Sequence, residues 1–128
     1  QDDLDNMKTG IFGYKGRVHY HLGTPINAWL SELDNLPRNE FFAQLSQRID
    51  REIHRGYRLY PCNYIALDEL AGTKVYAKHY TDNDKKTFED YLQGQLAKIN
   101  IPNKDEAYLR DCMLTMYANP VRNYYAAQ

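Results

Sequence analysis

Apolar residues recur at helical spacing in four stretches of the chain, whereas a single short run alternates in the manner of a β-strand. Residues three and four positions apart share one face of a helix, and residues two apart share one face of a strand. The alternating run covers residues 17–22 and is closed by Gly23-Thr24-Pro25. Because a lone strand needs a sheet to join, we predict a mainly α fold: a small helical domain with one or two short strands near the N-terminus.

Breakers and capping residues place the ends of the predicted helices. The clearest helix follows Pro37, has Asn39 as its cap, and ends near Arg55, before Gly56. Its apolar stripe consists of Phe41, Phe42, Leu45, Ile49 and Ile53. The other predicted helices cover residues 2–9, ended by Gly10; 26–36; 63–71, ended by Gly72; 81–99, capped by Thr81; and 104–118, broken or kinked at Asn119-Pro120.

The segment 57–61 joins two of these helices without a flexible linker. It should be extended, since the residue before a proline avoids the α region. The apolar residues of the two helices then have to converge. We therefore expect Ile53, Leu59, Tyr64 and Ile65 to be substantially buried at this junction.

Charge, hydropathy and cysteine content exclude several classes of protein. A net charge of −1 over 128 residues provides no basic field for nucleic acid, so we expect no nucleic-acid partner. No apolar run approaches the roughly 18–20 residues that span a bilayer. Cys62 and Cys112 form no CxxC pair and indicate free thiols of a cytoplasmic protein. The start at Gln1 in place of Met suggests a piece of a longer protein.

Four arginines are the candidate contacts for a lipid or phosphate group. Arg48, Arg51 and Arg55 recur at spacings of three and four, so they share a helix face, and Arg58 follows directly. Guanidinium groups match phosphate oxygens in geometry and charge. The alternative is that carboxylates of the same region pair with them on a solvated helix face. These carboxylates are Glu40, Asp50 and Glu52.

Two histidines are the candidate metal ligands, and they are weak ones. His19 and His21 would share one face of the predicted strand. No third ligand stands nearby at a recognisable spacing, so we interpret the pair as part of an exposed or partner-facing sheet surface. We predict no metal site and no cofactor.

Two motifs carry a resemblance to a known family. Residues 9–26 are TGIFGYKGRVHYHLGTPI, which resembles a strand pattern V-x-V-x-x-G-x-P-I, and residues 51–68 are REIHRGYRLYPCNYIALD. The former motif resembles the end of the catalytic domain of bacterial 1-acylglycerol-3-phosphate acyltransferase-like proteins, of the lysophospholipid acyltransferase family and its hemolysin/acyltransferase subgroup. The latter motif is similar to the stretch that follows this domain in that subgroup. Residues 73–128 are assigned by continuity alone.

The resemblance implies transfer of a fatty acyl group from a thioester donor to a lysophospholipid acceptor, in phospholipid biosynthesis. It puts residues 1–26 at the end of the acyltransferase core, as a loop and its last strand, and residues 27–128 in a C-terminal helical domain. The family's catalytic HxxxxD and Pro-Glu-Gly blocks lie upstream of the matched strand, so no catalytic residue is carried over. The expected partner is the upstream core of the same protein, and the expected location is cytoplasmic, peripheral on the inner face of the membrane.

His79 and Asp84 nevertheless form a literal HxxxxD. In the family this His is the general base for the acceptor hydroxyl, and the Asp orients it. Here Thr81 and its neighbours have the pattern of a helix start, and no Pro-Glu-Gly block follows, so we interpret the match as accidental. Two other functions remain open: a non-catalytic helical module that binds a membrane interface or a protein partner, and a stand-alone enzyme that uses His79 and Asp84.

Overall fold

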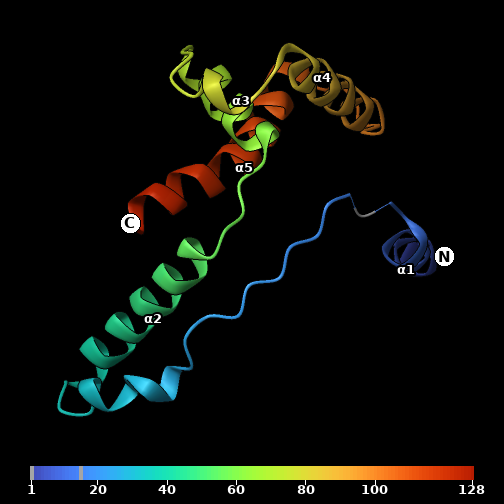
Figure 1. Cartoon of the computed structure of the whole chain (residues 1–128). Coiled ribbons are helices and arrows are strands. Elements are labelled where there is room, and N and C mark those ends of the chain that lie inside the picture. The colour runs from blue at the N-terminus through green and yellow to red at the C-terminus, as the bar shows by residue number, and fades with distance from the viewer. Residues whose placement is uncertain (1, 15) are drawn as a thin grey trace.

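A computed structural model describes residues 2–14 and 16–128, and these residues form five α-helices and three short 3-10 helices (Figure 1). The α-helices are α1 (Asp2–Phe12), α2 (Arg38–Arg55), α3 (Pro61–Ala71), α4 (Asp82–Ala97) and α5 (Glu106–Ala126). The 3-10 helices are η1 (Ile26–Ala28), η2 (Leu30–Leu33) and η3 (Ala77–His79). The predicted mainly helical fold is therefore confirmed.

The predicted strand at residues 17–22 is wrong for this structure. Over the described residues there is no strand, and the segment runs as extended chain between α1 and η1. The physical reason lies in the hydrogen bonds that define a strand. Among the described residues, no backbone hydrogen bond joins residues 17–23 to another segment. The alternation is present in the sequence, but it finds no ladder to join.

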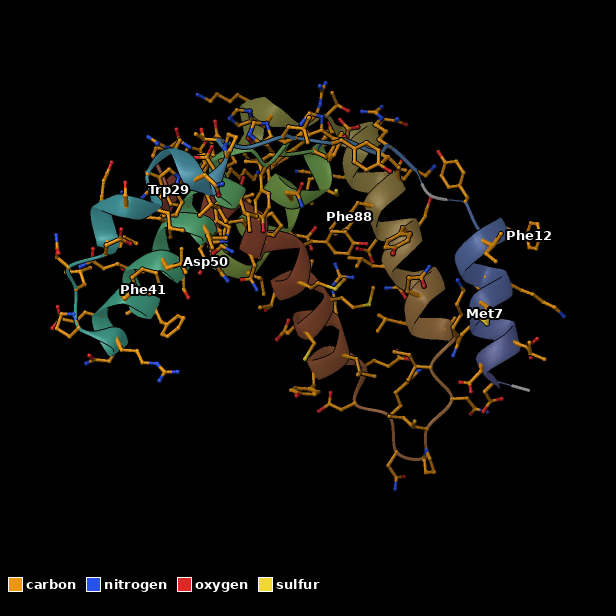
Figure 2. The ribbon with its side chains drawn as sticks, turned by 90° about the horizontal axis from the view of Figure 1, so that it is seen from below. Met7, Phe12, Trp29, Phe41, Asp50 and Phe88 are labelled. Atoms are coloured by element: carbon orange, nitrogen blue, oxygen red, sulfur yellow. The ribbon has the colours of Figure 1, made fainter. Side chains whose placement is uncertain are left out.

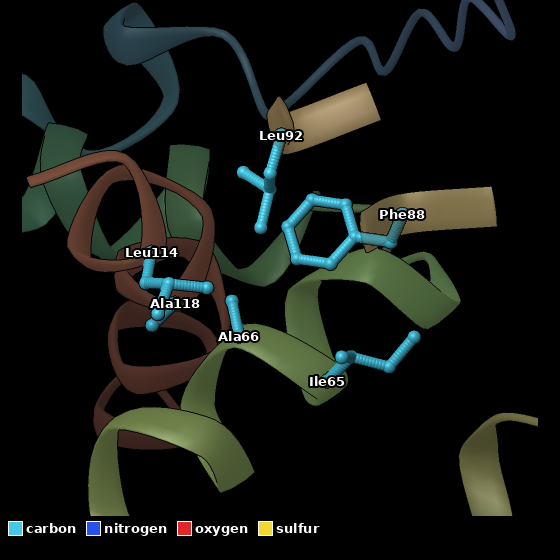
Figure 3. Close-up of a cluster of buried hydrophobic side chains, with 6 residues drawn as sticks. All are labelled: Ile65, Ala66, Phe88, Leu92, Leu114 and Ala118. Carbon is cyan, nitrogen blue, oxygen red and sulfur yellow. The ribbon is translucent and has the colours of Figure 1, made fainter. Parts of the chain in front are cut away.

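The core lies where α3, α4 and α5 meet. Each helix contributes two buried side chains, drawn together in Figure 3. They are Ile65 and Ala66 of α3, Phe88 and Leu92 of α4, and Leu114 and Ala118 of α5. The two alanines allow the helix backbones to approach closely, and the larger side chains fill the space between them. These six side chains form the hydrophobic core of the three-helix unit.

Asn63 ties α3 to α5 at the beginning of α3. Pro61 is the first residue of the helix, where its missing N–H costs nothing. The Asn63 Oδ1 accepts a hydrogen bond from the Tyr60 N–H at 2.8 Å, which caps the helix. The Asn63 Nδ2 donates to the Tyr117 carbonyl of α5 at 2.9 Å. Asn63 is buried, so each bond replaces one that water cannot provide.

Asp68 fixes the other end of α3. Its side chain is 2% exposed and accepts hydrogen bonds from the Thr73 hydroxyl, the Tyr76 N–H and the Tyr80 hydroxyl at 2.8, 3.0 and 2.8 Å. Gly72 adopts the left-handed conformation, and the Thr73 N–H bonds the Asp68 carbonyl, as in a Schellman turn. The carboxylate thus holds the chain between α3 and α4.

The four residues expected to be buried around the segment 57–61 differ in their exposure. Ile65 is buried, and Leu59 and Tyr64 are half-buried, but Ile53 is 50% exposed, which makes that prediction wrong. The reason is that α2 extends away from the three-helix unit (Figure 1), and none of its residues, all of which the structure describes, is buried. It contacts η2 and one part of α5, and Figure 2 labels Phe41 on α2 and Trp29 in the segment beside it.

Two predicted helix ends are also wrong. α5 continues through Pro120 to Ala126, although proline cannot donate to the carbonyl four residues earlier. Ala118 and Val121 beside it are fully buried, and this packing outweighs the lost bond. Likewise α1 runs through Gly10 to Phe12, because a glycine inside a helix is only modestly unfavourable.

No helix among the described residues is long and apolar enough to span a membrane.

Replacing Asp68 with Ala should lower the free energy of unfolding by about 1–3 kcal/mol, because it leaves three donors without their acceptor. Tyr80→Phe removes one of those donors and should cost less. Asp90→Ala, an exposed acidic residue of α4, is the matched control and should stay within about 0.5 kcal/mol of the wild type. Urea unfolding measures all three, and equal midpoints for Asp68→Ala and Asp90→Ala would contradict the role assigned to Asp68.

The pKa shifts of Asp68 and Tyr80 predict how the stability of the fold depends on pH. Burial opposes ionisation of Asp68, but the hydrogen bonds from Tyr80, Thr73 and the Tyr76 N–H outweigh it and lower its pKa. Its contribution is therefore present above the ordinary aspartate pKa of about 3.9 and is lost as pH falls below it. Burial and the bond to Asp68 raise the pKa of Tyr80 to about 12. That contribution is complete below about pH 10 and is lost as pH rises towards 12. In Tyr80→Phe the alkaline part of this loss should be smaller, as urea midpoints against pH would show.

Candidate functional site

The extended segment of residues 17–25, which we call the strap, lies against the C-terminal end of α2. The Thr24 N–H donates to the Glu52 carboxylate at 2.8 Å. This hydrogen bond is the main reason that the pKa of Glu52 is lowered, with a smaller contribution from the charges of His21 and Arg55. Gly23 allows the approach, because a Cβ there would stand 2.9 Å from the Glu52 Cγ.

A second contact joins the strap to the end of α2, four residues after Glu52. The His21 ring lies directly on Gly56, where a Cβ would be 2.7 Å from the His21 Cγ. Gly56 has a φ of −78°, a conformation open to any residue. Its lack of a side chain is therefore needed for this contact with His21, in addition to its place at the helix end.

Between the strap, the end of α2 and the segment that leads into α3 there is an open groove of about 610 Å³. This volume lies within the range of small-molecule sites. The strap residues that line it are Arg17, Val18, His19, His21 and Gly23. The facing residues are Glu52, Ile53, Gly56, Tyr57, Arg58, Tyr60, Asn63 and Pro120. The groove therefore combines an apolar lining with two guanidinium groups, two imidazoles and one carboxylate.

The strap has two different faces, because its side chains alternate. The odd-numbered positions from Arg17 to Gly23 line the groove, together with Val18. Tyr20 and Leu22 do not line it, and they are 89% and 95% exposed. One face of the strap is thus mainly polar and directed at the groove, and the other is apolar and open.

The four predicted arginines do not form one cluster. Arg48 is paired with Glu32 at 2.7 Å, and its guanidinium lies over the Trp29 ring. Arg51 lines a smaller cavity with Arg48 and Trp29. Arg55 is exposed on the same helix and lines neither cavity. Arg58 lines the groove.

The alternative prediction was that Glu40, Asp50 and Glu52 pair with the four arginines. The structure has one ion pair of these arginines among the described residues, with another carboxylate. The carboxylate paired with Arg48 is Glu32 of η2, which is not one of the three carboxylates expected from the sequence. A role of Arg48, Arg51, Arg55 or Arg58 in binding phosphate stays a prediction.

His79 and Asp84 have separate structural roles. The Asp84 carboxylate accepts hydrogen bonds from the Thr81 N–H and hydroxyl at 2.8 and 2.7 Å, which lower the pKa of Asp84. Thr81 is the N-cap of α4, as predicted. The His79 ring stacks on Tyr64, with 4.2 Å between ring centroids. Each side chain of the HxxxxD match is therefore engaged with a partner other than its counterpart in the motif.

His19, His21 and the two cysteines lie as follows in the described part of the chain. His19 and His21 both line the groove, and the described part of the chain holds no group of three or more His, Cys, Asp or Glu arranged to bind a metal. Cys62 and Cys112 are both free thiols, the former half-buried and the latter exposed. Burial raises the pKa of the Cys62 thiol.

The groove itself was not predicted from the sequence. Arg17 and His19 are separated from Arg58 by about forty positions, and no spacing rule links them. The available signal was the pair Gly23 and Gly56, which indicate a turn and a helix stop but which also mark where two segments touch.

No family model, curated protein or solved structure matches the chain.

The seating of the strap can be tested by hydrogen exchange. Glu52→Ala removes the acceptor of the Thr24 N–H, so the exchange of this amide should become about tenfold faster. Gly56→Ala should also accelerate it, since the new methyl group displaces the His21 ring. Asp50→Ala, an exposed carboxylate of the same helix, should leave the rate unchanged. Exchange of Thr24 that is equally fast in the wild type and all three variants would mean that the strap is not held on α2.

Proposed function

We propose that this chain is the C-terminal, mainly helical domain of a glycerolipid acyltransferase and is not itself the catalytic part. The enzyme of this proposal transfers a fatty acyl group from a thioester to a lysophospholipid, and its HxxxxD block belongs to a core that precedes the strap. The proposal starts from the two motifs at residues 9–26 and 51–68, which resemble that family.

The observation that carries the proposal is the state of the strap. It has the alternation of a strand, its backbone makes no ladder with the described residues, and its outward side chains Tyr20 and Leu22 are almost fully exposed. An extended segment whose N–H and C=O groups over residues 17–23 make no backbone hydrogen bond with the described residues, and which has one apolar face, is a template for pairing with a sheet. The last strand of an acyltransferase core would have this form before it is joined to that core.

The engagement of His79 and Asp84 supports the non-catalytic part of the proposal. A general base has to reach the hydroxyl from which it takes a proton, and an orienting carboxylate has to face that base. The Asp84 carboxylate caps α4 instead, and the His79 ring is stacked on Tyr64.

One observation favours the alternative of a docking module. α1 is amphipathic, and its apolar side chains are exposed; Figure 2 shows Phe12 pointing away from the rest of the molecule. Leu4, Met7 and Ile11 fall on one helix face. Such a face could bind a membrane interface or a protein partner, although the three aspartates in the first turn of α1 disfavour an anionic surface.

The chain alone should transfer no acyl group from an acyl thioester to lysophosphatidic acid. In the longer enzyme that contains it, His79→Ala should leave the rate unchanged. Tyr20→Pro should lower the rate strongly, because proline cannot donate to a ladder and disrupts a strand inside a sheet. Radiolabelled acyl transfer measures each case.

Tyr14→Pro is the matched control, since Tyr14 is exposed and precedes the strap. Turnover by the chain alone that His79→Ala abolishes would refute the proposal. Equal effects of Tyr14→Pro and Tyr20→Pro in the longer enzyme would mean that the strap does not pair with the core.

A further inference from the structure

We infer that α1 of one molecule docks on an aromatic and basic surface of a second copy of this chain. The surface, which we call the tyrosine surface, is formed by the segment between α3 and α4 together with the C-terminal end of α5. Its members are Lys74, Val75, Tyr76, Lys78 and Tyr125. It lies outside the groove, and the inference does not rest on the proposed acyltransferase function.

α1 needs a partner in order to be a stable helix. It has 11 residues, and none of them is buried. Isolated helices shorter than about 12–15 residues are marginal in water, and most helices of folded proteins are stabilised by the packing of an apolar face. The apolar face of α1 carries Leu4, Met7 and Ile11, each more than half exposed. In Figure 1, α1 lies apart from α3 and from the C-terminal end of α5, so its own chain leaves this face uncovered.

The charge of α1 limits the surfaces on which it can dock. The helix carries Asp2, Asp3 and Asp5 against a single cation, Lys8. The aspartates stand in the first turn, where they complement the helix dipole, and they remain exposed. An apolar helix face with an excess of negative charge beside it fits an apolar surface that is bordered by cations.

The tyrosine surface has this character. The Tyr76 and Tyr125 rings stack with 5.8 Å between their centroids, which joins the two segments that form the surface. Val75 is 71% exposed and Tyr125 is 46% exposed. Lys74 and Lys78 are exposed on either side of Tyr76 in the sequence, and neither forms an ion pair within the described residues. Exposed apolar side chains therefore stand beside free cations.

The neighbouring carboxylates do not cancel this positive charge. The two segments, residues 73–81 and 119–128, contain two lysines and one arginine but no Asp or Glu. Asp68 is 2% exposed and is held by three hydrogen bonds beneath the surface. Glu69 is in an ion pair with α5. Asp82, at the start of α4, is exposed, and the three cations outnumber it.

Another exposed apolar stripe of the molecule fits α1 less well. Tyr108 and Met116 are exposed on α5. The acidic side chains of the same stretch are Asp105, Glu106 and Asp111. Like charges across an interface oppose docking, so this stripe disfavours an acidic helix and supplies a control position.

The size of the contact predicts a weak dimer. An 11-residue helix is about 17 Å long. A two-fold arrangement places the α1 of each molecule on the tyrosine surface of the other. Two such helices give an interface at the low end of the usual size range, so we expect association above roughly 0.1 mM protein.

Sedimentation velocity over protein concentrations from about 10 μM to about 1 mM tests the dimer. The wild type should pass from monomer to dimer, and the dimer should weaken as salt rises. Asp3→Lys/Asp5→Lys should weaken association about tenfold, and so should Lys74→Glu/Lys78→Glu. The four substitutions combined should restore it to within about threefold of the wild type, because opposite charges face each other again.

Two matched controls separate the tyrosine surface from a general effect of charge or polarity. Lys86→Glu/Lys98→Glu makes the same change of charge at exposed positions on and directly after α4, and it should leave association within about twofold of the wild type. Val75→Asp should abolish the dimer, whereas Met116→Asp should retain it. Urea midpoints of each variant show that a loss of association occurs in a folded protein.

Four results would overturn the inference. The wild type stays monomeric at every concentration, or the charge-reversed lysine pair dimerises as well as the wild type. Tyr20→Pro alone abolishes the dimer, which would assign it to pairing of the strap. The α1 amide NMR shifts respond to the lysine reversal in a protein that stays monomeric, which would mean that α1 docks on its own chain. Failure of the proposed acyltransferase function is distinguishable from all four, because acyl transfer measures it.

Discussion

The bond from the Asn63 amide to the Tyr117 carbonyl joins the two helices on which the rest of the molecule depends. α3 is the central helix: it packs against α5 and α4 and is followed by the turn that Asp68 holds. Asn63 is buried, so a side chain without both of its bonds would be strongly unfavourable there. This requirement fixes the rotation of α3 about its axis, and the rotation sets which side chains face the core.

The same bond lies beside the proline of α5, next to the Met116 carbonyl that loses its helical donor to Pro120. Pro120 takes one donor out of the helix three residues after Tyr117. A polar partner from α3 at the Tyr117 carbonyl, together with the burial of Ala118 and Val121, holds this part of α5 against its neighbours. Pro120 also lines the groove. One turn of α5 therefore contributes Ala118 and Val121 to the buried interior and Pro120 to the lining of the groove.

Local signals were sufficient for most of the fold. Thr81 and Gly72 were predicted to begin and end helices, and they do so through a capping box and a left-handed turn. Gly10 and Pro120 were misleading, because a breaker is only a local cost that packing or the rest of the helix can outweigh. The exposure of Ile53 was beyond local reasoning, since an amphipathic stripe shows which face is apolar but not whether anything covers it.

The groove could not be predicted for a related reason: its residues come from segments whose contact is set by the fold. The motif at residues 51–68 nevertheless contains both of its fixed parts. Its first half supplies Glu52 and Gly56, which contact the strap, and Arg58, which lines the groove. Its second half supplies Asn63 and Asp68, which anchor α3. A stretch that orients the core helix and also faces the strap couples the two, so a ligand or a sheet that moved the strap would act directly on the residues that seat α3.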